Sequence, residues 1–247
     1  MEPFIHFQHV KKAFDEKVIY TDLDLEIHKG ETITIIGGSG TGKSVMLKLL
    51  LVLMRPEAGQ ILFDGKDVLG MKDEELIGIR KRVGMLFQGG ALFDSMTVFD
   101  NVAYPLYEHY KEYSEEKIAR IVHEKLEVIG LPETADMMPA DLSGGMKKRV
   151  ALARAIATDP EVILYDEPTT GLDPTNTNRI NDLILDLQRR FKVTSIVVTH
   201  DMASAFKVSN RLALLYNKRI EFVGNKEQID KSDNVVVKKF ISGQIGE

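Results

Sequence analysis

Residues Gly37-Gly38-Ser39-Gly40-Thr41-Gly42-Lys43-Ser44 decide the fold of this 247-residue chain. They lie between a β-branched run at residues 32–36, typical of a buried strand, and a helix predicted over residues 43–54. In this context the pattern G-x-x-x-x-G-K-[ST] predicts a loop whose backbone N–H groups cradle phosphate. Lys43 would reach the outer phosphates, and the Ser44 hydroxyl would ligate Mg²⁺. A plain Gly-Ser turn is the alternative, and the flanking strand and helix disfavour it.

The regions around this loop predict a sheet covered by helices. Apolar residues alternate near residues 5–7 and 23–27, so the first 30 residues are expected to form antiparallel strands, with His6 and His9 on opposite faces. Short strands are expected between residues 58 and 88, and a helical insert around residues 114–129. The second half alternates helix and strand, at residues 144–157, 162–165, 174–191 and 195–199. This alternation indicates a parallel sheet with helices on its faces.

Composition excludes several functional classes. Lys and Arg total 32 against 37 Asp and Glu, a net charge of -5, so no overall electrostatic attraction to nucleic acid is expected. The chain has no cysteine, which excludes disulfides, thiolate zinc sites, iron–sulfur clusters and a thiol nucleophile. The apolar run at residues 49–54 is far shorter than the about 20 residues that span a bilayer. With no secretory leader pattern, the chain is expected to stay in the compartment where it is made.

Two carboxylates follow a predicted buried strand. The run Val162-Ile163-Leu164-Tyr165 leads into Asp166, and Glu167 comes next. A phosphate loop with bound Mg²⁺ needs an acidic ligand at the carboxyl edge of the sheet, and Asp166 is placed for that task. Glu167 would orient or deprotonate an attacking water. An ordinary strand end is the alternative. The pair indicates a metal and catalytic site because it occurs together with the phosphate loop at residues 37–44.

A second phosphate-binding nest is expected where a helix starts after Leu142. Ser143 and the exposed amides of Gly144 and Gly145 would form it. The cations that follow are Lys147, Lys148 and Arg149. Cations there oppose the helix dipole, so we expect a solvated or phosphate-facing turn and an anion supplied from elsewhere. One nucleotide does not need two nests from one chain, so the second nest is expected to serve a partner subunit.

With these motifs the sequence resembles the nucleotide-binding subunits of ABC transporters over nearly the whole chain. The family's motifs occur in order, as the phosphate loop 37–44, Q-loop Gln88, signature 142–146, Walker B Asp166-Glu167, D-loop 171–173 and switch His200. The resemblance implies an α/β fold of the P-loop NTPase class, an ABC-type nucleotide-binding domain with a mainly parallel core sheet, an antiparallel β subdomain and a helical insert. It implies one domain over residues 1–247, with a helical subdomain at about 89–158 inserted in the RecA-like core and a C-terminal segment at 225–247.

The resemblance further implies an ATPase that binds ATP and Mg²⁺ as a homodimer. Each ATP would lie between the phosphate loop of one chain and the signature residues Ser143, Gly144 and Gly145 of the other. The implied ATP-binding residues of the first chain are Phe14, which stacks on adenine, and Gly37, Gly38, Ser39, Gly40, Thr41, Gly42, Lys43 and Ser44. The implied metal ligands are Ser44, Gln88 and Asp166, and the implied catalytic residues are Glu167, His200 and Gln88. Glu167 would activate water, and His200 would contact the γ-phosphate and stabilise developing charge.

The segment from Gln88 to Val102 narrows the choice of transporter. Its double glycine, Gly89-Gly90, and Asp94 resemble the Mla-type (MCE-associated) phospholipid transport ATPases. This resemblance implies a subunit that powers phospholipid transport between membranes to maintain outer-membrane lipid asymmetry. Its partners would be an integral membrane permease docked on this segment and an MCE-type lipid carrier. The chain would be cytoplasmic and peripheral on the inner face of the inner membrane, with no transmembrane segment.

Two other functions are compatible with the same motifs. The ATPase of a small-solute ABC importer would also carry them, and the double glycine would then be incidental. A non-transporting ABC regulator of the cell-division type would use ATP to control an assembly. A competing interpretation of the residues after Gln88 is a plain surface loop whose glycines only permit a turn.

Overall fold

A computed structural model describes residues 2–244. Over these residues the strands are β1 (Ile5–Phe14), β2 (Lys17–Ile27), β3 (Thr32–Ile36), β4 (Ala58–Phe63), β5 (Lys66–Asp67), β6 (Val83–Leu86), β7 (Val162–Asp166), β8 (Thr194–Val198), β9 (Arg211–Tyr216) and β10 (Arg219–Gly224). The α-helices are α1 (Lys43–Leu50), α2 (Asp73–Lys81), α3 (Val98–His109), α4 (Glu115–Val128), α5 (Gly144–Ala155), α6 (Pro174–Phe191), α7 (Met202–Val208), α8 (Lys226–Asp230) and α9 (Val235–Ile241). The two ends of the predicted domain, residue 1 and residues 245–247, lie outside the described part.

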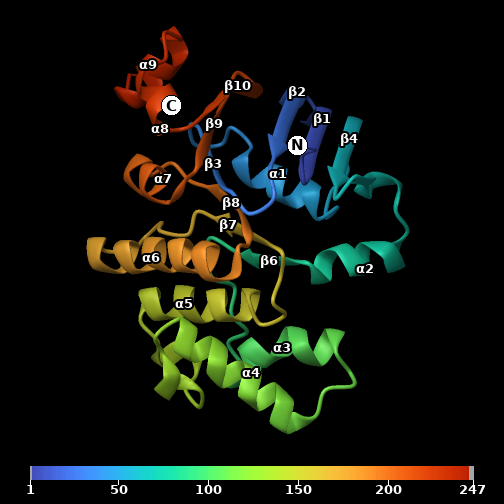
Figure 1. Ribbon diagram of the computed structural model, residues 1–247, viewed down its shortest axis with the longest axis vertical. Coiled ribbons are helices and arrows are strands. Elements are labelled where there is room, and N and C mark those ends of the chain that lie inside the picture. The colour runs from blue at the N-terminus through green and yellow to red at the C-terminus, as the bar shows by residue number, and fades with distance from the viewer. Residues whose placement is uncertain (1, 245–247) are drawn as a thin grey trace.

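All ten strands within residues 2–244 join one sheet, in the order β5-β4-β1-β2-β10-β9-β3-β8-β7-β6. The pairs from β9 to β6 are parallel, and the pairs from β5 to β2 are antiparallel. Strand β10 joins the two parts, since it pairs antiparallel with β9 and parallel with β2. Figure 1 shows the antiparallel strands β1, β2 and β4 at the upper right, beside the core. The predicted α/β class with a mainly parallel core sheet is confirmed.

The central strands have the composition of a sheet that is covered on both faces. Every residue of β3, β7 and β8 is buried, and apolar side chains dominate all three strands. This is the pattern of parallel strands between two layers of helices, whereas β2 alternates between buried and exposed positions over its second half. Helix α1 packs on one face of the core sheet, while α5 and α6 pack on the other.

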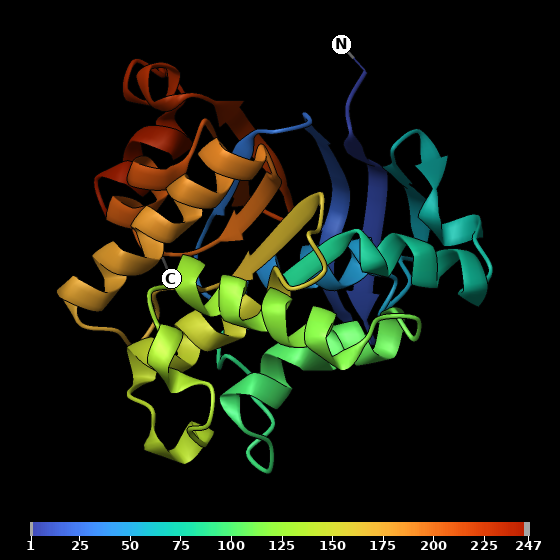
Figure 2. The same cartoon turned by 60° about the horizontal axis from the view of Figure 1, so that its bottom comes forward.

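Helices α3, α4 and α5 form a separate helical part. They lie together below the sheet in Figure 1, and Figure 2 brings the same group forward. Their apolar faces share one hydrophobic core with α6 and with the face of β7 and β8 that lies opposite α1. The boundary predicted for the helical subdomain, about 89–158, encloses all three helices, and residues 225–244 contain α8 and α9.

Two helices differ from the expectation. Helix α1 ends at Leu50 and not at residue 54, because the chain turns back at Val52, whose φ is 51°, and the Leu53 N–H bonds to the carbonyl of Lys48 at 2.9 Å. Helix α2 occupies a region where only short strands were expected. Its start is marked by the Glu75 carboxylate, which accepts from the backbone N–H of Lys72 at 3.0 Å. Acidic residues fill its first turn and basic ones its last, in line with the helix dipole.

The expectation that His6 and His9 point to opposite faces is wrong. His9 has a φ of 49°, and the pairing of β1 with β2 shifts between Phe7 and Val10, so a bulge resets the alternation. Both rings lie beside Asp24, at 3.5 Å for His6 and 4.0 Å for His9. A hydrogen bond to Asp22 at 2.9 Å raises the pKa of His9. Within residues 2–244 no cluster of three His, Cys, Asp or Glu side chains is arranged to hold a metal.

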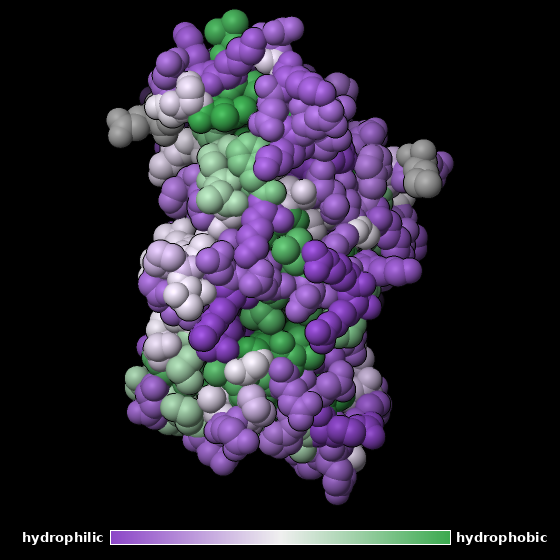
Figure 3. Space-filling view, turned by 60° about the vertical axis from the view of Figure 1, so that its left-hand side comes forward, coloured by the Kyte–Doolittle hydropathy of each residue, from purple (hydrophilic) through white to green (hydrophobic). Residues whose placement is uncertain are grey.

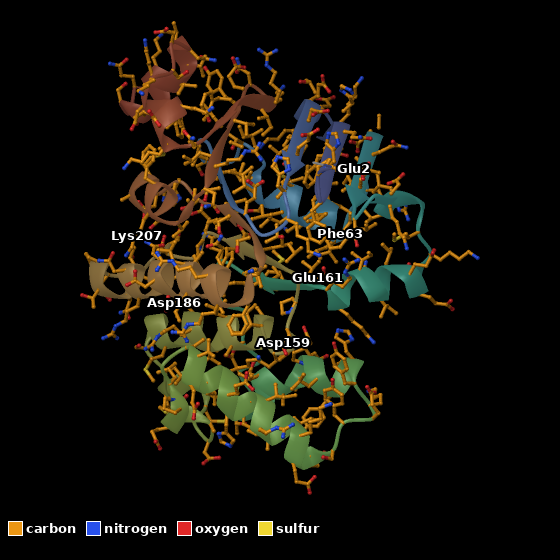
Figure 4. All side chains as sticks on the ribbon, in the orientation of Figure 1. Glu2, Phe63, Asp159, Glu161, Asp186 and Lys207 are labelled. Carbon is orange, nitrogen blue, oxygen red and sulfur yellow. The ribbon has the colours of Figure 1, made fainter. Side chains whose placement is uncertain are left out.

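Arg82 links the parallel and antiparallel parts of the sheet. Its Nε donates to Glu161 Oε1 at 2.5 Å, and its Nη2 donates to Asp64 Oδ2 at 2.8 Å. Its guanidinium carbon lies 4.8 Å from the centroid of the Phe63 ring. Figure 4 labels Phe63 and Glu161 near the centre of the molecule. The hydrogen bond from Arg82 lowers the pKa of Glu161.

Gly84 lies where the sheet and the helical part pack closely together. It lies in β6, and a Cβ added there would overlap the backbone carbonyl oxygen of Ala155 at the end of α5. Backbone cannot move aside as a flexible side chain can. A larger residue would therefore push α5 away from the sheet.

We expect Gly84→Ala to lower the free energy of unfolding by about 2–3 kcal/mol, as overpacking does in a dense core. Gly78→Ala is the matched control, because Gly78 lies inside α2 and, apart from the backbone of its own helix and its chain neighbours, no described atom lies within 4 Å of its Cβ position. That change should raise stability by about 0.5–1 kcal/mol. Urea unfolding measures both values. An unchanged stability for Gly84→Ala would contradict the described contact.

Candidate functional site

The residues singled out in the sequence meet at the carboxyl edge of the parallel strands. Strand β3 leads into the loop 37–42, and β7 ends at Asp166. Gln88 follows β6, and His200 follows β8. Ligands bind at this edge in open α/β sheets. A cavity of about 450 Å³ opens there, lined by Phe14, Lys17, Ile19, Ser39, Gly40, Gly42, Lys43, Ser44, Val45, Gln88, Glu167 and His200.

The loop requires glycine where it packs most tightly. Gly42 has a φ of 109°, and a Cβ there would lie 2.5 Å from the Ile19 side chain. The Tyr20 hydroxyl also donates to the Gly42 carbonyl at 2.6 Å, which fixes the start of α1 against β2. Within the loop, Thr41 Oγ1 donates to the Gly38 carbonyl at 2.9 Å. Loop and helix start are therefore held in one conformation by residues from outside the motif.

Lys43 lies at the base of the loop and is 6% exposed. Its Nζ donates to the carbonyls of Gly37 and Gly38, each at 2.9 Å, and lies 3.9 Å from Glu167 Oε1. Burial lowers the pKa of Lys43, and the nearby carboxylates of Glu167 and Asp166 oppose that shift. A cation in this position attracts the negative charge of a phosphate.

Ser44 and Asp166 form a pair of oxygen groups beside Lys43. The Ser44 hydroxyl donates to Asp166 Oδ1 at 2.6 Å, which joins the first turn of α1 to the end of β7. Asp166 is 7% exposed. Mg²⁺ prefers oxygen ligands such as a hydroxyl and a carboxylate. It is usually held by one or two carboxylates together with phosphate and water.

Glu167 is held by side chains from two segments, residue 170 and residues 199–200. Its Oε2 accepts from Thr170 Oγ1 at 3.0 Å and from Thr199 Oγ1 at 3.4 Å, and lies 2.9 Å from His200 Nδ1. Its φ is 49°, an uncommon conformation for a residue other than glycine. Thr170 and Thr199 are not among the site residues expected from the sequence. Their positions in the sequence could have indicated them, because Thr170 lies three residues after Glu167 and Thr199 immediately precedes His200.

Phe14 lies at the outer rim of the cavity and is 42% exposed. The ammonium of Lys12 lies 4.9 Å from the centroid of its ring. One face of an aromatic ring at the mouth of a phosphate site can stack on a planar base. Its position is therefore compatible with the role expected for it.

The signature residues are not part of this cavity. Ser143 caps the start of α5, where its hydroxyl accepts from the Met146 N–H at 3.3 Å, and both Ser143 and Gly144 are exposed. Gly144 faces open space, whereas Gly145 is buried against Asn176. One chain therefore brings together the phosphate loop, Gln88, Asp166, Glu167 and His200, and leaves Ser143 and Gly144 on its surface.

The expectation of a solvated or phosphate-facing turn is wrong for two of the three cations in the first turns of α5. Lys148 is 6% exposed, and its ammonium donates to the carbonyls of Gln88 and Glu167. Arg149 donates to the carbonyls of Ile129 and Gly130. Both side chains therefore donate to carbonyl oxygens of the chain itself and are not turned toward a solvated phosphate site.

The model of the family described as "ABC transporter" matches residues 20–170. The chain belongs to this family. As an ABC protein it has the fold of an ATP-binding cassette, and the predicted fold class and family are confirmed. None of the helices in residues 2–244 combines the length and the apolar character that a membrane crossing demands.

Two relatives and one solved structure show the likeness. The chain is 44% identical to the intermembrane phospholipid transport system ATP-binding protein MlaF of Haemophilus influenzae. The 229 aligned residues cover 93% of this chain and 86% of that protein. It is 43% identical over 240 residues to the probable ribonucleotide transport ATP-binding protein mkl of Mycobacterium leprae, covering 97% and 69%. The cassette MJ0796, in a dimeric post-hydrolysis state bound to ADP and Pi, matches with a TM-score of 0.82 and 33% identity, covering 90% and 98%. An ATPase activity of this chain agrees with these findings.

We expect Lys43→Ala to weaken ATP binding at least tenfold, because it removes the buried cation at the base of the loop. Lys48→Ala is the control, since Lys48 is exposed on the same helix and should leave binding unchanged. Isothermal titration calorimetry with ATP checks both variants. If Lys43→Ala binds ATP like the wild type, the loop is not the ATP site.

Proposed function

We propose that this ABC protein is the ATP-hydrolysing subunit of a transporter that moves phospholipid between membranes and so maintains outer-membrane lipid asymmetry. The observation that carries the proposal is the 44% identity to MlaF over 93% of the chain. The double glycine Gly89-Gly90 after Gln88 supports the same assignment. In this proposal the chain is cytoplasmic and peripheral on the inner face of the inner membrane.

In the proposed site, ATP enters the cavity at the edge of the sheet. Phe14 stacks on adenine, the amides of residues 37–44 bind the phosphates, and Lys43 pairs with the outer phosphate oxygens. The oxygen groups of Ser44, Asp166 and Gln88 fit Mg²⁺ by their chemistry, and Ser44 and Asp166 are already hydrogen-bonded to each other. When bound, Mg²⁺ neutralises charge that develops on the phosphates.

Glu167 is the proposed base. It orients a water, whose oxygen attacks the γ-phosphorus, and it accepts the proton that this water loses. The bond from the γ-phosphorus to the bridging oxygen breaks, and ADP and phosphate leave. The contacts from Thr170, Thr199 and His200 fix the carboxylate. While the bond breaks, His200 contacts the γ-phosphate and stabilises the charge that develops on it.

A second copy of the chain completes the proposed site. The exposed Ser143 and Gly144 lie at the start of α5 and are not among the residues that line the chain's own cavity. A helix start of this kind binds an anion. The dimeric state of the related cassette MJ0796 supports an arrangement in which Ser143, Gly144 and Gly145 contact the ATP held by the other chain.

The permease is proposed to dock in a groove next to the segment that begins at Gln88. A cavity of about 420 Å³ lies between β6, α3 and the end of α5, and the aromatic side chains Phe87, Phe93 and Tyr104 in it are each 38–39% exposed. Exposed aromatic rings in a groove are typical of a protein interface. The MCE-type lipid carrier would join the complex through the permease.

Lipid itself is not expected to touch this chain. An acyl chain gains about 0.8 kcal/mol for each buried CH₂ group, so its path needs continuous apolar surface. The face in Figure 3 is mostly hydrophilic, and its hydrophobic areas are separated by hydrophilic residues. In this proposal the chain supplies the energy of ATP hydrolysis, and its membrane partners supply the path.

We expect Glu167→Gln to bind ATP but to lower its hydrolysis at least a hundredfold, because an amide cannot accept the proton. Glu74→Gln, at an exposed position of α2, is the matched control and should hydrolyse ATP normally. Phosphate release and ATP titration measure the two properties. A freely hydrolysing Glu167→Gln protein would show that Glu167 is not the base.

The transport assignment is tested by purifying tagged Glu167→Gln protein from detergent-solubilised native membranes with ATP and Mg²⁺. Mass spectrometry should find a permease, an MCE-type carrier and phospholipid. Adding Phe93→Asp should release these partners, while Phe191→Asp, at an exposed phenylalanine outside the groove, should retain them. Recovery of a solute-binding importer or a division complex would overturn the lipid assignment and leave the ATPase standing.

A further inference from the structure

A buried lysine joins the signature helix to the proposed catalytic site. Lys148 lies on α5 and is 6% exposed, although lysine is rarely buried to this extent. Its Nζ donates to the carbonyl oxygen of Gln88 and, at 3.3 Å, to the carbonyl oxygen of Glu167. Both acceptors are backbone groups of residues to which the proposed chemistry assigns a role.

The location of the two carbonyls follows from the sheet. Strands β6 and β7 are parallel neighbours, with Leu86 opposite Tyr165, so Gln88 and Glu167 leave the sheet at the same edge. The ammonium of Lys148 therefore bridges the segments that follow β6 and β7. Without it, the two backbone carbonyls would lose a charge-assisted donor, and such bonds contribute more than neutral ones.

The burial of this ammonium has an energetic cost. Burial lowers the pKa of Lys148, while the nearby carboxylates of Asp166 and Glu167 raise it. An apolar side chain of similar length would pack in the same space without that cost. The packing of α5 alone does not require a charged side chain here, whereas the two carbonyl groups that Lys148 contacts do use its charge.

A second contact holds the same loop to the same helix. Arg154, at the end of α5, donates to the carbonyls of Gly90 and Ala91 at 2.9 Å each. Gly90 and Ala91 both have positive φ, at 77° and 50°, and in this turn both of their carbonyls reach Arg154. The segment that follows Gln88 is therefore a loop whose carbonyls are bound by two cations of α5, Lys148 and Arg154.

The other end of α5 carries the signature. Ser143 precedes Lys148 by five residues, about 7.5 Å along the helix axis. A displacement of α5 as a rigid helix would move the signature residues and the carbonyl contacts of Lys148 together. Lys148 thus connects the chain's own cavity with the surface that would face the ATP of a second chain.

We propose that Lys148 is a positioning residue that holds Gln88 and Glu167 in a fixed relation to the signature helix α5. It acts through their backbone and does not touch the nucleotide. This inference rests on the proposed function, because it assigns Lys148 a part in ATP hydrolysis. The link between Lys148 and the loop can be tested without hydrolysis.

The first experiment compares ATP turnover of Lys148→Met with that of Lys125→Met. Lys125 is a lysine of α4 that is 3% exposed and pairs with Asp159, so its variant also removes a buried ammonium but no contact to Gln88 or Glu167. We expect Lys148→Met to lower kcat at least tenfold with a change in KM for ATP of less than about threefold, and Lys125→Met to keep kcat within about twofold. Lys148→Arg, whose guanidinium can also donate to two carbonyls, should restore most of the turnover.

The second experiment measures amide hydrogen exchange over residues 87–91 in the protein without nucleotide. Lys148→Met should accelerate exchange in this segment, and Lys125→Met should not. If Lys148→Met does not fold, Lys148→Gln provides a neutral donor of lower bonding strength and should show the same direction of change. Normal turnover and normal exchange in the Lys148 variants would overturn the inference, as would equal losses in the Lys125 control. An inactive wild type whose loop exchange still depends on Lys148 would instead refute the proposed function.

Discussion

The parallel pairing of β7 with β6 on one side and β8 on the other is the constraint on which the site depends. Asp166 lies opposite Val198 and Tyr165 opposite Leu86, so the residues that follow each strand leave the sheet at one level. Strand β3 pairs with β8 and brings the glycine loop to the same edge. A shift of one residue in any of these pairs would separate Asp166 from Ser44, and Glu167 from His200, by more than a hydrogen bond can span.

Much of this arrangement follows from local sequence. The strand at residues 32–36 and the helix at residues 174–191 have the predicted bounds, because the first is a β-branched run and the second begins with Asp173 as a cap before Pro174. Helix α4 begins after Ser114, at the start of the expected range, and the Ser114 hydroxyl caps it. In each case the deciding groups lie within a few residues of the element that they define.

The features that could not be predicted depend on contacts between distant segments. The bulge at His9 is visible only in the pairing of β1 with β2 and β4. The acceptors of Lys148 are backbone carbonyls 60 and 19 residues away, and a carbonyl is present at every position of a sequence. The three cations near the start of α5 are visible in the sequence, but the carbonyl acceptors of Lys148 and Arg149 are not. The roles of the individual site residues and the bounds of the subdomain stay predictions.

The two outermost strands of the sheet are its shortest, with two residues in β5 and four in β6. A sheet edge exposes unpaired N–H and C=O groups to any passing strand, and a short edge offers few of them. Another copy of the chain therefore finds little backbone on which to extend the sheet. This limits edge-to-edge aggregation at the high local concentration that copies of a chain reach while they are being synthesised.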